Sequence, residues 1–231
     1  ARLLPSAALP LSLAVAAFAS PDSSKAIVRV NVDAGAFAHA DGRPTPLDVA
    51  IAAVDQTGRL VASARQRSTV ALTGSGPRRM AEAAVQSHLE LPRGEYEVRV
   101  AVTDAERGKV ASVFSDVTVP PFESEPLSLS DVTVDVATSP SSGPAPTTRR
   151  VFHRGDRVRA LLQIYQGTNR TEPARPVSMR VQIVDAKGTA VRDQALTSTE
   201  AMFANRRADC VITLPLANLP PGKYLLKLDA S

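Results

Sequence analysis

Residues 154–156 read Arg-Gly-Asp, an integrin-type tripeptide with a candidate binding chemistry. The same residues also form an ordinary tight turn before a strand, with glycine at the bend and aspartate as the cap, and we favour the turn. Residues 169–171 form a sequon for N-glycosylation in a predicted loop, which matters only in a cell that glycosylates. Asp-Ser-Ser at residues 22–24 lacks the alternate Asp-x-Ser-x-Ser spacing of a metal-ion-dependent adhesion site.

The residue types that bind metals or carry out catalysis are too dispersed to predict a reaction. His39, His88 and His153 are far apart in the sequence, and Cys210 is the only cysteine. Tetrahedral zinc needs clustered ligands and a disulfide needs two cysteines, so we predict no metal site and no intrachain disulfide. No glycine-rich phosphate loop, G-x-S-x-G elbow or pair of carboxylates stands out. We therefore predict no enzymatic activity and no cofactor, although a catalytic set assembled from distant residues leaves no sequence pattern.

The basic residues do not form a recognisable nucleic-acid-binding module. The 231 residues carry a formal net charge of +4. Arginines at predicted solvent-facing strand positions include Arg29, Arg99, Arg159 and Arg180. The densest cluster consists of Arg149, Arg150, Arg154, Arg157 and Arg159, with Phe152 as the only interleaved aromatic residue. Nucleic-acid surfaces need stacking aromatics or a known module. We interpret the cluster as a solvated strand edge, since charges protect edges from pairing, and predict no nucleic-acid partner.

Two copies of the pattern Leu-Pro-x-Gly-x-Tyr organise the rest of the chain. Gly94 and Gly222 lie at the two corners, and Tyr96 and Tyr224 each open a strand in which apolar residues alternate with other residues. A period of two indicates a half-buried strand, and we place both glycines in the corner before it. The pattern resembles the tyrosine corner of Greek-key sandwiches, where the phenol bonds the corner backbone. The alternative is that both tyrosines bind a ligand.

The sequence upstream of each corner is duplicated as well. Residues 46–58 match residues 176–188 at a separation of 130, and the two tyrosines are separated by 128. Each matching segment ends in a predicted hairpin turn, in which Gly58 or Gly188 supplies a positive φ angle. Segments in one order at a nearly constant separation indicate a duplicated domain. Two sandwich-sized copies predict two domains rather than a solenoid.

Composition supports two sandwiches with modest aliphatic cores. Hydrophobic residues make up 44% and aromatic residues 4%, tryptophan is absent, and 18 prolines outnumber 12 glycines. Such a composition suits many short strands with stiff corners. We predict an all-β chain with two tandem immunoglobulin- or fibronectin type III-like β-sandwich domains. We predict the first sandwich at residues 11–120, a stiff linker at 121–126 and the second sandwich at 127–231.

The strands are predicted from alternation and turn residues. They are expected at residues 11–18, 26–33, 47–54, 60–72, from 85 to the first corner, 96–102, 109–119, 127–138, 157–165, 177–184, 208–214 and 223–229. Residues 1–20 also have features of a signal peptide, and residues 80–84 of a helical turn. We favour a strand from residue 11. The sequence contains no run of 18 or more apolar residues, so we predict no membrane span.

We expect the second sandwich to lack one strand that the first contains. Residues 109–119 follow the first tyrosine strand, whereas the second ends at Ser231, where the corresponding strand would begin. We therefore expect an unpaired edge on the strand at 223–229, with Tyr224, Leu226 and Leu228 incompletely covered. Such an edge favours pairing with another chain, so self-association through this domain is expected.

The corner and its surroundings resemble one protein family. Residues 89–119, 121–122, 125–130, 152–156 and 219–224 are similar to the C-terminal region of acidobacterial von Willebrand factor type A-related proteins. In that family a type A domain precedes this region, and residues 1–10 would be its last residues. The metal-binding motif of that domain is absent from this sequence, so no family site residue is carried over. The resemblance implies an exported protein, in the periplasm or at the cell surface.

These observations favour a non-catalytic structural or interaction module that spaces or presents an upstream domain and has a protein partner. The alternative is an adhesin-type module that binds carbohydrate or protein. Clustered exposed aromatic residues on one face would favour the adhesin, and the aromatic content of 4% counts against it. A third hypothesis, an enzyme fragment, has no candidate residues.

Limited proteolysis tests the two-domain prediction. We expect first cuts at residues 139–146 or 74–77, because stretches rich in Gly, Pro and Ser between predicted strands expose their backbone to proteases. Mass spectrometry of the early fragments identifies the cut sites. First cuts inside residues 49–54 or 98–102 would contradict the domain assignment.

Overall fold

A computed structural model describes residues 9–20, 24–71, 84–122, 124–137, 144–167 and 172–231 of the chain. Several sequence predictions lie outside these residues in whole or in part. They concern the tail at 1–10, the Asp-Ser-Ser stretch at 22–24, the Gly-Pro stretch at 74–77, the helical turn at 80–84, the loop at 139–146 and the sequon at 169–171.

The chain divides into two compact units, each of which is all-β. Unit 1 consists of residues 1–120 with 146–150, and unit 2 of residues 121–145 with 151–231. The main division falls at Pro120, where the first sandwich was predicted to end. The predicted linker at 121–126 instead groups with unit 2, because Phe122 is buried and its ring lies 4.9 Å from that of Tyr165.

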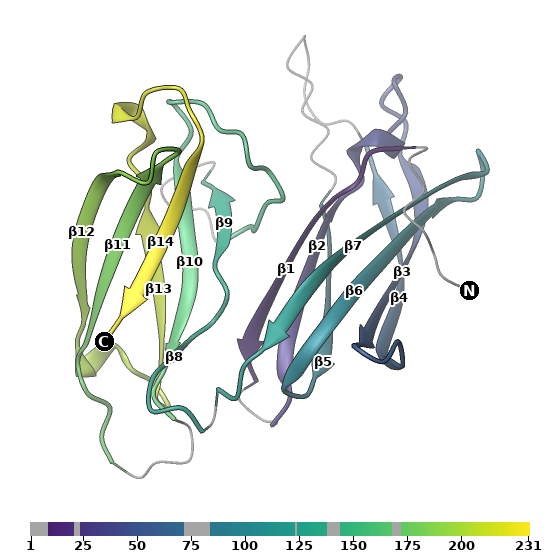
Figure 1. The fold of residues 1–231 in the computed structure, drawn as a ribbon. Coiled ribbons are helices and arrows are strands. Elements are labelled where there is room, and N and C mark those ends of the chain that lie inside the picture. Colours follow the sequence, from purple (N-terminus) through teal and green to yellow (C-terminus); the bar gives the residue numbers. More distant parts are fainter. Residues whose placement is uncertain (1–8, 21–23, 72–83, 123, 138–143, 168–171) are drawn as a thin grey trace. The chain divides into compact units, whose positions relative to one another are not determined.

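Unit 1 contains a three-stranded and a four-stranded antiparallel sheet (Figure 1). The first has the order β1-β2-β5, with β1 (Ser12–Ala19), β2 (Ala26–Asp33) and β5 (Ala84–Leu91). The second has the order β4-β3-β6-β7, with β3 (Thr45–Asp55), β4 (Leu60–Val70), β6 (Gly94–Asp104) and β7 (Lys109–Val119). β1 forms the strand favoured for this region, and it pairs with β2 along its whole length.

Alternation places the apolar residues of both sheets in one core. Val28, Val30 and Val32 of β2 are fully buried, and so are alternate residues of the opposite sheet. Those of β3 and β6 include Leu47, Val49, Ile51, Ala53, Val98, Val100 and Val102. The residues between them are half-buried or exposed, as a period of two requires for a sheet with one covered face.

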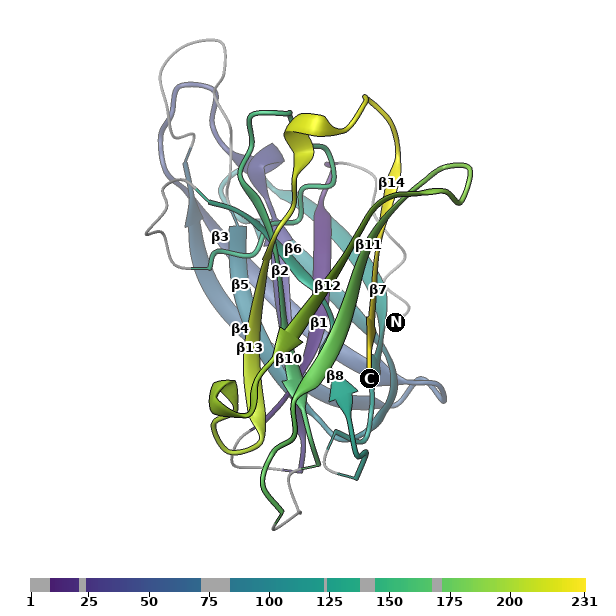
Figure 2. The same ribbon diagram turned by 90° about the vertical axis from the view of Figure 1, so that its left-hand side faces the viewer.

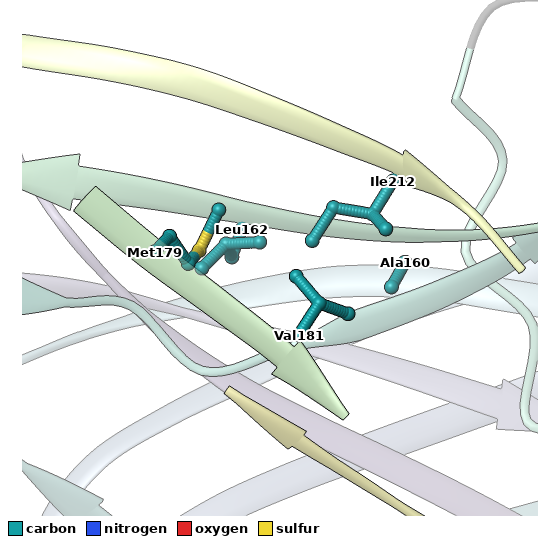
Figure 3. Packing of buried hydrophobic residues seen from close by; sticks show 5 residues of the cluster. All are labelled: Ala160, Leu162, Met179, Val181 and Ile212. Atoms are coloured by element: carbon teal, nitrogen blue, oxygen red, sulfur yellow. The ribbon is translucent and has the colours of Figure 1, made fainter. Parts of the chain in front are cut away.

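Unit 2 repeats this arrangement with shorter strands. One sheet has the order β13-β10-β8, with β9 also paired to β10, and the other has the order β12-β11-β14. The strands are β8 (Ser128–Leu129), β9 (Thr133–Val136), β10 (Val158–Tyr165), β11 (Val177–Asp185), β12 (Ala190–Ser198), β13 (Arg207–Thr213) and β14 (Tyr224–Ala230). Figure 3 shows Met179 and Val181 of one sheet packed against Ala160, Leu162 and Ile212 of the other.

The single strand predicted at residues 127–138 is two strands separated by a bulge. Three residues, Ser130 to Val132, lie opposite the two residues Leu162 and Gln163 of β10. The Ser130 N–H donates to the Gln163 carbonyl at 2.9 Å, and the Ser130 hydroxyl accepts the Gln163 N–H at 2.8 Å. The side chain thus takes the place of a backbone acceptor, and the register shifts by one residue.

Other boundaries also differ from the sequence predictions. Gly94 is the first residue of β6 and pairs with Val119, so it belongs to the ladder as well as to the corner. For the region of β12 the sequence predicted the preceding hairpin turn but no strand, because most of the residues are exposed and apolar and polar residues do not alternate.

Short 3-10 helices occupy Gly35–Phe37 (η1), Glu200–Met202 (η2) and Leu216–Asn218 (η3). No helix among the described residues has the length and apolar character to cross a membrane.

Candidate functional site

The corner before β6 is held by a hydrogen bond from the buried Tyr96. Its hydroxyl donates to the Pro92 carbonyl at 2.9 Å, and its side chain is largely excluded from solvent. Gly94 has φ +150°, and a Cβ there would lie 3.0 Å from the Tyr96 hydroxyl, so no larger residue fits without displacement. Burial, aided by the negative charge of Asp55, raises the pKa of Tyr96. The phenol is therefore engaged by the corner backbone rather than offered to a ligand.

The corner before β14 has the same bond in a more open setting. The Tyr224 hydroxyl donates to the Pro220 carbonyl at 2.7 Å, but the ring is only half-buried. A Cβ on Gly222 would lie 3.5 Å from the Tyr224 ring and hydroxyl, which is ordinary van der Waals contact. Gly222 is therefore not sterically required, in contrast to Gly94.

The two hairpin turns use an aspartate and a glycine in the same way. Gly58 and Gly188 both have φ +82°, as predicted for their turns. One carboxylate oxygen of Asp55 accepts the backbone N–H groups of Thr57 and Arg59, each at 3.0 Å. Asp185 accepts the corresponding pair in unit 2. These aspartates close their own turns.

The carboxylate of Asp55 is stabilised in its charged form. The hydroxyl of Thr57 donates to it at 2.6 Å, and the Arg59 side chain contacts it at 3.1 Å. The Thr57 bond is the main cause that lowers the pKa of Asp55 to about 2, and bonds from Arg59 add to it. Asp55 therefore remains a carboxylate at neutral pH.

A shallow polar hollow of about 840 Å³ lies beside this turn in unit 1. Its lining includes Asp55, Gln56, Glu95, Glu97, Arg99 and Asp116. Gln56 donates to Glu95, and Arg99 forms an ion pair with Glu97, so these charges are partly satisfied by one another. Within the described residues, no group of three His, Cys, Asp or Glu side chains is arranged to hold a metal ion.

The Arg-Gly-Asp tripeptide is a turn before β10. The Asp156 N–H donates to the His153 carbonyl at 3.0 Å, and the Asp156 carboxylate accepts the His153 N–H at 2.9 Å. The carboxylate that an integrin-type contact would need is thus bonded to its own turn. Arg154 is exposed. The geometry agrees with the turn interpretation.

The arginine cluster is divided between the two units. Arg149 and Arg150 belong to unit 1, whereas the other three arginines belong to unit 2. Arg159 was predicted to face solvent, but this is wrong, because its side chain is 15% exposed and bonds the buried Asp135 of β9. Its Nε lies 2.9 Å from a carboxylate oxygen of Asp135. Adjacent positions in sequence therefore serve different structural purposes.

The remaining candidate groups lie on different elements. His39 follows η1, His88 lies on β5 and His153 precedes β10. Cys210 on β13 is half-buried beside both apolar clusters of unit 2, and burial raises the pKa of its thiol. All nine aromatic residues lie in described segments, and Phe114 of β7 is the only one that is clearly exposed.

The open edge of β14 is the feature that most resembles an interaction site. β14 pairs with β11, and among the described residues no strand pairs with its other side (Figures 1 and 2). Tyr224, Leu226 and Leu228 are half-buried, whereas their counterparts on β6, which β7 covers, are buried. Leu225, which points to the opposite face, is 64% exposed and was not singled out by the sequence patterns.

No protein-family model matches this chain, and no curated protein matches its sequence.

The two corner tyrosines provide a matched pair of substitutions. We expect Tyr96→Phe to reduce the free energy of unfolding of unit 1 by about 1 kcal/mol or more, because the hydrogen bond from the buried Tyr96 phenol to the Pro92 carbonyl is lost. Tyr224→Phe should cost unit 2 less, since solvent reaches the half-exposed corner. Denaturant melts of both variants and the parent measure the difference. Equal losses, or no loss for Tyr96→Phe, would contradict the distinction.

Acid titration tests the Asp55 turn. The pKa of Asp55 falls from 3.8 to about 2 on folding, so its contribution to stability is present above pH 3.8 and is lost as the pH falls toward 2. Asp55→Asn should therefore flatten the dependence of the stability of unit 1 on pH in this interval. Carbon-13 NMR of the Asp55 carboxyl follows its titration directly. A midpoint near 3.8 would contradict the proposed hydrogen-bonding cause.

Proposed function

We propose that this chain is a non-catalytic structural and interaction module of an exported bacterial protein. Its two sandwiches space or present an upstream von Willebrand factor type A domain. The observation that carries the proposal is that the side chains suited to chemistry are used to hold the fold. Asp55, Asp185 and Asp156 close turns, and Asp135 pairs with Arg159 inside unit 2.

The distribution of aromatic side chains favours this role over that of an adhesin. Carbohydrate-binding surfaces use exposed aromatic rings, and the adhesin hypothesis requires several on one face. Phe114 is clearly exposed, and the other eight aromatic residues are buried or half-buried. Tyr96 and Tyr224 direct their hydroxyls to backbone carbonyls. A single exposed ring does not form such a surface.

The resemblance to von Willebrand factor type A-related proteins supports the position and location proposed. It rests on the corner pattern at Tyr96 and Tyr224 and on the segments around them. Each sandwich is a rigid domain. Two such domains in tandem suit the display of a binding domain away from its anchor.

A domain-replacement experiment tests the proposal in the full-length protein. Residues 11–231 are replaced by an unrelated tandem pair of immunoglobulin-like domains of equal length, and in a second variant they are deleted. We expect the replacement to keep ligand binding by the upstream domain and the deletion to impair it. Fractionation of the native cells should find the protein in the periplasm or at the surface.

Direct binding assays on the isolated chain provide the control. Glycan arrays and a panel of hydrolase substrates should give no signal with residues 1–231. Specific glycan binding would favour the adhesin, and turnover that depends on one of its side chains would establish an enzyme. The absence of a type A domain from the full-length protein would overturn the presenting role.

A further inference from the structure

The backbone groups at the open edge of β14 belong to alternate residues. Ser231 and Ser178 exchange two backbone hydrogen bonds of 2.9 Å, so Ser231 directs its groups toward β11. Direction alternates along a strand, and the odd-numbered residues of β14 therefore also face β11. The residues whose N–H and C=O groups face the open edge are Tyr224, Leu226, Leu228 and Ala230.

The side chains along this edge suit a second strand of the same sequence. On the inner face, Leu226 and Leu228 are half-exposed and contact the apolar cluster of unit 2. On the outer face, Lys227 and Asp229 form an ion pair at 3.2 Å within the strand, and their side chains are 54% and 53% exposed. An antiparallel copy meets the same residues in reverse order, which allows apolar and opposite-charge pairs together.

Charge selects one register for this pairing. Donors and acceptors align only when even-numbered residues lie opposite even-numbered residues. The register with Leu228 opposite Leu228 of the second copy also sets Lys227 opposite Asp229, twice by symmetry. The next register sets Lys227 opposite Lys227, and like charges directly opposite are destabilising. The one after that sets Lys227 opposite Leu225 and loses its ion pairs across the edge.

We propose that β14 pairs with β14 of a second copy of this chain around a two-fold axis, with Leu228 opposite Leu228. The β12-β11-β14 sheets of the two copies then form one continuous sheet. Leu226 lies opposite Ala230 on the inner face, and Lys227 and Asp229 alternate with their counterparts on the outer face. The pairing is isologous, so it closes as a dimer rather than growing into a fibre. It does not depend on the spacing role proposed above.

Charge reversal tests the register. Sedimentation equilibrium of the 231-residue chain over a wide range of concentration should show a dimer. Lys227→Asp should weaken the dimer about tenfold, because two opposite-charge pairs become like-charge pairs. The double variant Lys227→Asp with Asp229→Lys restores both pairs and should restore the dimer. Both side chains are more than half exposed, so the monomer fold should be retained, which circular dichroism verifies.

Two further variants separate edge pairing from general charge effects. Ala230→Pro removes an N–H that faces the open edge and leaves the bonds to β11 intact, so it should weaken the dimer without unfolding unit 2. Lys187→Asp makes the same charge change in the hairpin turn and should have no effect. A chain that stays monomeric overturns the proposal. So does a dimer that Lys187→Asp weakens as much as Lys227→Asp, or one that the double variant fails to restore.

Discussion

Each of the four sheets in the described part of the chain has one apolar face, and most other features follow from the need to cover it. Alternate residues of β2, β3 and β6 are buried, and they are mainly valine, leucine, isoleucine and alanine. Branched aliphatic side chains pack well on a pleated surface, so a chain with few aromatic residues still forms a core. In unit 1 the covering is complete along β6, because β7 lies beside it. In unit 2 it is incomplete along β14, and the half-exposed Leu226 and Leu228 result.

The tyrosine corners show how one sequence pattern meets two environments. Both phenols donate to a proline carbonyl four residues earlier. At Tyr96 the ring is buried, which makes the loss of the bond costly and leaves no room for a side chain at Gly94. At Tyr224 the corner is open to solvent, and the same glycine position is tolerant. The duplicated motif therefore has a common geometry but a different energetic weight in each unit.

Buried carboxylates in both units form ion pairs that hold parts of the fold together. Asp104 at the end of β6 is fully buried and accepts the Arg107 N–H at 3.0 Å, while the Arg107 guanidinium also bonds the Phe37 carbonyl. Asp135 and Arg159 form a similar pair between β9 and β10. Removing one partner of such a pair leaves an uncompensated buried charge, which is strongly destabilising. These pairs thus fix the positions of loops and strands that hydrophobic packing alone leaves free.

Local patterns in the sequence determined most of the strands, the hairpin turns at Gly58 and Gly188, and the all-β fold class. A period of two and the positive φ of a turn glycine depend only on neighbouring residues, so they are legible without the structure. The tilted ring contact between Phe122 and Tyr165, the bulge opposite Gln163 and the pairing of Arg159 with Asp135 were decided only by the tertiary structure. Each joins residues that are distant in the chain, and no local period records which distant partner a side chain meets. The direction of the N–H and C=O groups at the open edge of β14 was also decided by the tertiary structure. It depends on which residues of β14 form hydrogen bonds with β11.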